Sequence, residues 1–102
     1  MSIKKQFLKS KPVCKVSFKV MGEQAGNAGK VNVVGDFNNW DASGDEMKKL
    51  KDGSFSHTVE LETGKEYQFR YIADDATWFN DDGADSYVSN GQGDAMNGIL
   101  SL

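Results

Sequence analysis

Apolar and polar residues alternate along several short segments of the chain, as in β-strands that bury one face. Residues 13–20 show this clearly, because every second position is apolar: Cys14, Val16, Phe18 and Val20. Other segments that suit strands lie at 30–34, 55–61, 66–73, 77–79 and 99–102. In residues 66–73 the alternation places Phe69 on the face that would be buried and Arg70 on the opposite face.

Turn-forming residues separate these segments. Pro12 precedes a strand, Asp52-Gly53 is typical of a hairpin turn, and residues 63–65 form a further turn. Residues 45–52 are ambiguous and could form a short strand. No segment has helical periodicity. Short strands at this spacing predict an all-β fold, an immunoglobulin-like antiparallel β-sandwich of about seven strands.

Composition narrows the class of protein. The chain has 102 residues and a net charge of −3, so we expect one domain over residues 12–102. Residues 1–11 are expected to form a flexible basic arm. The first 21 residues contain six lysines and no acid, but the acidic remainder would repel a phosphate backbone, so no nucleic-acid partner is expected.

Cellular context can also be predicted. The chain has neither a long apolar run nor a signal-peptide pattern, so we expect no membrane partner. Cys14 is the only cysteine, which excludes an internal disulfide framework. It is compatible with a cytoplasmic location.

The segment from Gly35 to Asp41 has an unusual composition for a turn. It reads Gly-Asp-Phe-Asn-Asn-Trp-Asp and directly follows the apolar run 31–34. A large flat ring at Trp40, among amides such as Asn39, suits a ligand with a flat apolar face and a rim of hydroxyls. A sugar ring fits that description.

Several motifs in order along the chain carry a family resemblance. The chain resembles the isoamylase early-set domain, which includes the family 48 carbohydrate-binding modules and the glycogen-binding domain of the AMP-activated protein kinase beta subunit. The resemblance extends over about residues 11–102, in the form of a stand-alone bacterial domain. The segments that carry it lie at 35–41, 52–55, 61–71, 78–81, 84–87 and 97–99.

The resemblance implies a non-catalytic module that binds α-1,4-glucans such as glycogen or starch, as polysaccharide or oligosaccharide. It also implies a partner among proteins of glycogen metabolism. The residues that match the family's binding positions are Trp40, Arg70, Trp78 and Asn97, with Asn39 beside Trp40. Sugar faces would stack on the indoles, while Arg and Asn would bind hydroxyls.

Each of the central residues also has a purely structural interpretation. Trp40 and Trp78 could each close one end of the core. Arg70 could form a surface ion pair with Asp74 or Asp75. The functional alternative is a protein-interaction or regulatory early-set domain that has lost glucan binding, or an inert relic of a branching or debranching enzyme.

Two departures from the family pattern concern the edge of the expected site. Residues 92–96 differ from the apolar-residue and Thr pattern that precedes the family's Asn, and the Arg70 to Trp78 spacing is one residue longer than in the kinase domain. Asn97 could instead cap the last strand through a backbone group, and Asn39 is a natural turn former.

Other chemistry lacks the necessary residues. His57 and Cys14 are single, so zinc binding and Cys/His catalysis lack ligands. The acids near Gly83 do not have EF-hand spacing, and a looser calcium site is the alternative to solvated loop acids. Paired carboxylates also need a cleft to act as a glycosidase. We therefore expect no enzymatic activity, no cofactor and no metal.

Overall fold

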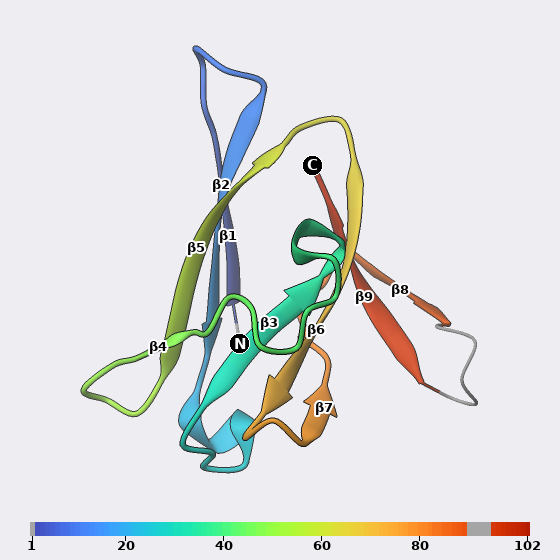
Figure 1. Ribbon diagram of the computed structural model, residues 1–102. Helices are drawn as coiled ribbons and strands as arrows, with labels where there is room; N and C mark the ends of the chain where they lie inside the picture. The colour runs from blue at the N-terminus through green and yellow to red at the C-terminus, as the bar shows by residue number, and fades with distance from the viewer. Residues whose placement is uncertain (1, 90–94) are drawn as a thin grey trace.

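The computed structural model describes residues 2–89 and 95–102. Over these residues two antiparallel sheets pack face to face, which confirms the predicted β-sandwich (Figure 1). The first sheet has the order β1 (Ser2–Phe7), β2 (Val13–Val20), β5 (Phe55–Glu62), β4 (Lys48–Lys49). The second has the order β3 (Val31–Gly35), β6 (Glu66–Ala73), β9 (Met96–Ser101), β8 (Ser86–Ser89), with β7 (Thr77–Phe79) also paired to β6.

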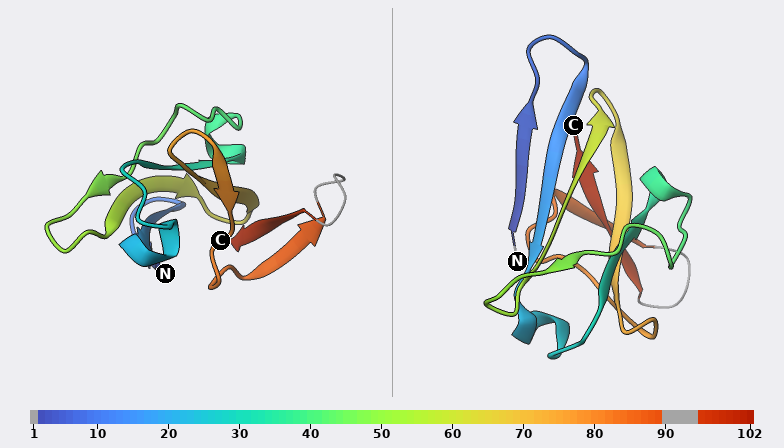
Figure 2. Two further views of the ribbon diagram at one scale, coloured as in Figure 1. Left: turned by 90° about the horizontal axis from the view of Figure 1, so that it is seen from below. Right: turned by 60° about the vertical axis from the view of Figure 1, so that its left-hand side comes forward.

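The nine described strands exceed the expected seven because strands also form at Ser2–Phe7 and Ser86–Ser89, where the alternation predicts none. Lys48–Lys49 is the strand within the ambiguous segment, and Ser86–Ser89 pairs with β9. The hairpin turn between β4 and β5 is confirmed, with the N–H of Gly53 donating to Leu50 O at 3.0 Å. β4 and β8 lie at opposite sides of the sandwich (Figures 1 and 2).

Alternate residues of both sheets form the core. The inward positions of β2 are fully buried, as their period-two pattern predicts. The Phe18 ring lies 5.4 Å from the Phe69 ring and 6.3 Å from the Tyr71 ring, between ring centroids. Burying one such side chain contributes roughly 1.5–3 kcal/mol. The aromatic contacts therefore hold β2 against β6 and fix which side chains of β6 face outward.

The N-terminal segment differs from the expected flexible arm. Ser2–Phe7 forms β1, paired with β2 along its whole length. Ile3 packs against the core, and Lys5 Nζ lies 2.7 Å from Asp85 Oδ2 on the second sheet's side. An apolar side chain and a cross-sandwich ion pair thus order a segment that reads locally as a lysine-rich tail.

Strand β6 is the centre of the second sheet. On one edge it pairs with β3 from residue 69 to residue 73. Its other edge is shared, because β9 pairs with residues 66–69 and β7 with residues 71–73. The loop after β3 starts with the 3-10 helix η2 (Asp36–Asn38) and returns across β3 toward β4 (Figure 1). Arg70 on β6 and Trp78 on β7 thereby share one outer face of the second sheet, and the loop after β3 begins beside Phe69 of β6.

Candidate functional site

The loop from Gly35 to Asp41 is fixed to the sandwich at several points. Gly35 approaches β6 so closely that a Cβ atom would lie 2.4 Å from Gln68 O and 2.8 Å from Phe69 Cβ. The next aromatic ring, Phe37, stacks on Phe18 in the core at a centroid distance of 6.0 Å. The glycine and the first aromatic residue of the motif therefore have packing roles.

Asn38 stabilises the turn itself. Its Oδ1 accepts the N–H of Gly35 at 3.0 Å, and its Nδ2 donates to Val33 O at 3.0 Å and to Asp45 Oδ2 at 2.8 Å. Asp45 in turn lies 3.2 Å from Nε2 of His57, a half-buried residue at the edge of the core. Asn38 is therefore a turn-forming residue whose side-chain hydrogen-bonding groups are used within the protein.

Asn39 and Trp40 form the tip of the loop in left-handed conformation, each with φ of 58°. Such a φ is uncommon for Asn and strained for a residue as bulky as Trp. Asn39 is exposed and Trp40 is half-buried. The indole Nε1 donates to Asp36 Oδ1 at 2.8 Å, so Trp40 is attached to its own loop and does not close the core.

Arg70 and Trp78 lie together on the outer face of the second sheet. The Arg70 guanidinium carbon is 5.8 Å from the centroid of the Trp78 ring, a distance at which cation–π attraction operates. Arg70 Nε donates to Asn80 Oδ1 at 3.3 Å, and Asn80 Nδ2 donates to Met96 O at 3.0 Å. Trp78 is 40% exposed, so it does not close the core.

The acids proposed as ion-pair partners of Arg70 have other partners. Asp74 Oδ1 accepts the backbone N–H groups of Gly29 and Lys30 at 3.0 and 3.1 Å. Asp75 Oδ1 lies 3.3 Å from Lys30 Nζ. Arg70 is therefore held by an amide and an aromatic ring.

The outer face between the two Trp residues has an apolar base. Val34 pairs with Arg70 and Ile72 pairs with Trp78 across neighbouring strands. Such directly paired side chains have Cβ atoms about 5 Å apart on the same face. Val34 is fully buried and Ile72 is 3% exposed, although both point away from the main core.

Trp40 and Trp78 come from elements on opposite edges of β6, the strand that carries Arg70. The Trp40 loop begins beside Phe69, the partner of Gly35, and Trp78 pairs with Ile72. Three residues of strand separate these two positions by about 10 Å. Arg70 lies between them on the outward side. We call these three residues the Trp platform.

Asn97 lies on β9, next to the strand that carries Arg70. It is 7% exposed, and its Nδ2 donates to Gln68 Oε1 at 3.0 Å. Gln68 and Arg70 share the outward side of β6, and the pairing of Phe69 with Gly98 sets Asn97 beside Arg70 in the register of the sheet. Its role as a sugar contact stays a prediction. Residues 92–94 of the departing segment lie outside the described residues.

A buried polar contact fixes the chain that follows β7. The Tyr71 hydroxyl donates to Asp81 Oδ2 at 2.7 Å, and the other oxygen, Oδ1, accepts the N–H of Gly83 at 2.7 Å. Burial, together with the Asp81 carboxylate, raises the pKa of Tyr71 far above its usual range. Tyr71 therefore stays protonated and keeps the segment after Trp78 in place.

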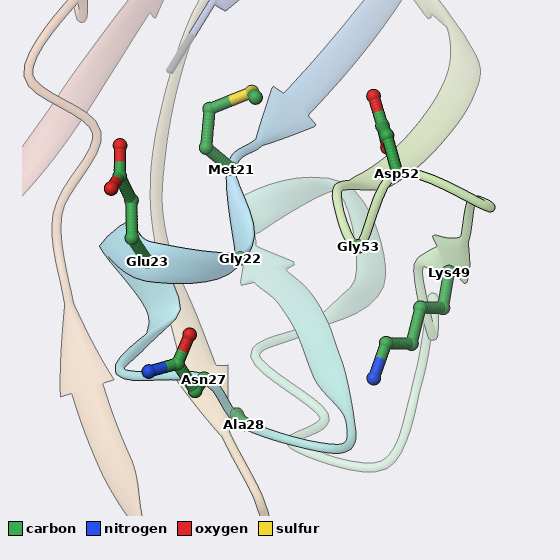
Figure 3. Close-up of a pocket in the computed structure, with 8 residues that line it drawn as sticks. All are labelled: Met21, Gly22, Glu23, Asn27, Ala28, Lys49, Asp52 and Gly53. Carbon is green, nitrogen blue, oxygen red and sulfur yellow. The ribbon is translucent and has the colours of Figure 1, made fainter.

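Two hollows lie at the η1 (Gly22–Ala25) end of the sandwich, and the second is lined by Thr77 and Phe79, the neighbours of Trp78 on β7. The one in Figure 3 has a volume of about 320 Å³, and Lys49 extends into it toward Ala28. Neither hollow is lined by a residue of the Trp platform.

The described part of the chain contains neither a three-ligand metal cluster nor a helix suited to cross a membrane. Within it, no group of three His, Cys, Asp or Glu side chains could hold a metal ion. Among the same residues, no helix has the length and apolar character needed to cross a membrane.

Comparison with protein-family models identifies the domain. Residues 13–89 match carbohydrate-binding module 48, the isoamylase N-terminal domain. The chain belongs to this family. Carbohydrate-binding module 48 is a non-catalytic domain, and its function as a family is to bind carbohydrate. The comparison with curated proteins gave no match.

The match covers the whole Trp platform and ends before Asn97. Sequence reasoning found the three platform residues but not Asp36 and Asn80, which contact two of them. Neither residue has a local sequence signal, because an acid after a strand and an Asn after a Trp are ordinary turn residues.

Proposed function

We propose that this carbohydrate-binding module 48 domain binds α-1,4-glucans, such as glycogen or starch chains, on the Trp platform. The observation that supports the proposal most strongly is the Arg70 guanidinium, 5.8 Å from the ring of the 40% exposed Trp78 on the outer face of the second sheet. A glucan chain offers repeated sugar faces in a row, so Trp78 and the half-buried Trp40 could each bind a different sugar unit.

The chemistry of each group suits a part of the sugar. Indole faces attract the C–H face of a glucose ring by dispersion and by burial of apolar area. Arg70 donates through Nε to Asn80. The terminal nitrogens of its guanidinium carry further N–H donors, which could bind sugar hydroxyls. Asn39, exposed at the loop tip, would add a contact beside Trp40.

A flat and partly exposed surface should bind weakly. We expect a dissociation constant between about 1 mM and 1 μM for a short oligosaccharide, equivalent to roughly 4–8 kcal/mol. A polysaccharide carries many copies of the same chain, so the retention on glycogen should exceed that on an oligosaccharide through rebinding.

Affinity electrophoresis in a native gel containing glycogen tests the proposal. The domain should be retarded, and Trp40→Ala and Trp78→Ala should each restore most of the free mobility. Phe7→Ala is the matched control, because Phe7 is an exposed aromatic residue on β1, 55% exposed and outside the platform. Equal mobility of the unmodified domain with and without glycogen would refute the proposal.

A further inference from the structure

We propose that Asp36 is a positioning residue that sets the orientation of the Trp40 indole, and that glucan affinity depends on it. The second half of this inference rests on the proposed function. Both oxygens of the Asp36 carboxylate are used: Oδ1 accepts the Trp40 Nε1–H at 2.8 Å, and Oδ2 accepts the backbone N–H of Gln68 at 2.8 Å. One side chain thereby joins the indole to β6.

The bond to Gln68 places Asp36 where the sheet ends. Gly35, paired with Phe69, is the last residue of β3, and the carboxylate takes the next N–H of β6 in place of a backbone carbonyl. Asp36 is thus held relative to the rigid centre of the sheet. Hydrogen bonds to an ionised carboxylate are shorter and stronger than those between neutral groups, which suits a residue that orients another.

Trp40 needs such an anchor because its backbone hydrogen bond does not fix the orientation of its side chain. Asn39 and Trp40 both have positive φ at the loop tip, and Trp40 N–H is bonded to Gly35 O at 2.9 Å. That bond fixes the main chain but leaves the side-chain torsions free. The bond from Nε1 to Asp36 restricts those torsions, so that less side-chain freedom is lost when a ligand binds.

The same bond determines how Trp40 can contact a ligand. With its only N–H group engaged by Asp36, the indole offers a ring face and no donor. Trp40 would then contribute stacking, while hydroxyl recognition falls to Arg70.

The first experiment tests the positioning role and does not involve glucan. Trp78→Phe leaves Trp40 as the single tryptophan, because the chain has only two Trp residues, and excitation at wavelengths where Tyr does not absorb reports Trp40 alone. In that background Asp36→Ala should lower the fluorescence anisotropy of Trp40 and increase its quenching by acrylamide. Asp36→Asn keeps one acceptor oxygen and should give an intermediate change.

Asp41→Asn is the matched control, since Asp41 lies in the same loop and its carboxylate accepts Ser43 N–H and Oγ–H at 2.9 and 2.7 Å. It should leave Trp40 unchanged. Urea unfolding of each variant shows whether the fold persists, and Asp36→Asn serves if Asp36→Ala does not fold. Unchanged anisotropy and quenching in a folded Asp36 variant would overturn the positioning role.

The second experiment measures maltoheptaose binding by calorimetry with Trp78 intact. Asp36→Ala should weaken binding about tenfold, equivalent to about 1.4 kcal/mol, and Asp41→Asn should not. Unchanged affinity in a variant with a loosened indole would overturn the link to binding. No binding by the unmodified domain would instead refute the proposed function, while the fluorescence result would still decide whether Asp36 positions Trp40.

Discussion

The outer faces of the two sheets have the same periodicity and opposite chemistry. On the first sheet, Lys4, Ser17 and Thr58 lie side by side across β1, β2 and β5. On the second sheet the equivalent row across β3, β6 and β7 is Asn32, Ile72 and Trp78. Lys4 and Thr58 are exposed, whereas Asn32 is fully buried and Ile72 is 3% exposed.

The difference shows that alternation alone does not identify a solvated face. On the first sheet, the outward-facing side chains of each strand are polar and face water, as expected for an antiparallel sheet that is covered on one side. The second sheet covers part of its outer face with the loop after β3 and with side chains of the platform. An apolar surface with a half-exposed Trp, outside the main core, is typical of a binding surface.

Substituting Asp at one position on each outer face should give the largest contrast. Val34→Asp places a carboxylate at a fully buried position on the second sheet and should destabilise the fold by about 3 kcal/mol or more. Thr58→Asp makes a similar change in shape at an exposed position on the first sheet and should change stability by about 0.5 kcal/mol or less. Urea unfolding measures both; equal effects would refute the contrast between the faces.

Arg70→Lys should have a smaller effect, on binding alone. The variant keeps the positive charge but loses the planar guanidinium that lies over Trp78 and the Nε donor to Asn80. We expect maltoheptaose affinity to fall about threefold, with little change in unfolding. Lys19→Arg on the first sheet should leave the affinity unchanged. Full affinity in Arg70→Lys would mean that only the charge matters.

Lys5→Met should have a small effect, on stability alone, that depends on pH. Partial burial opposes ionisation of Asp85, but hydrogen bonds from Lys5 and the Ser101 N–H, with the Lys5 charge, outweigh it and lower the pKa of Asp85. A lowered pKa contributes stability above the unfolded value of about 3.9, and this stability is lost as the pH falls through the folded value.

Lys5→Met should therefore cost about 0.5–1 kcal/mol at neutral pH, and the difference from the unmodified domain should shrink in acid. Urea unfolding at about pH 7 and about pH 2 measures it. A difference that persists unchanged in acid would show that the ion pair with Asp85 is not its source.

Local patterns in the sequence predicted the parts of the fold that depend on alternation. Cys14 to Val20 and Phe69 to Tyr71 alternate strictly, and both segments are strands with the expected buried faces. Arg70 was expected outward because Phe69 was expected inward, and the structure agrees. The composition of residues 35–41, with a Trp among amides directly after a strand, predicts a sugar-binding loop, and this stays a prediction.

The remaining features depend on contacts that are distant in sequence. Lys5 reads as part of a basic tail until Asp85 is placed beside it, 80 residues later. Asn97 reads as an exposed polar residue until Gln68 is found to bind its amide. Asp36 contacts β6, 32 residues later, through Gln68. Local periodicity and turn preferences depend only on residues close in sequence. They therefore could not predict these three long-range contacts.

The most direct test of the central claim is a nitrogen–proton NMR titration with maltoheptaose. The two indole N–H signals report Trp40 and Trp78 separately, and the Arg70 backbone amide reports the strand between them. All three signals should shift and saturate together with maltoheptaose, and cellohexaose should leave them unchanged. The claim would be contradicted if these signals stayed constant at millimolar maltoheptaose, or if the shifts occurred instead at Lys4, Ser17 and Thr58 on the first sheet.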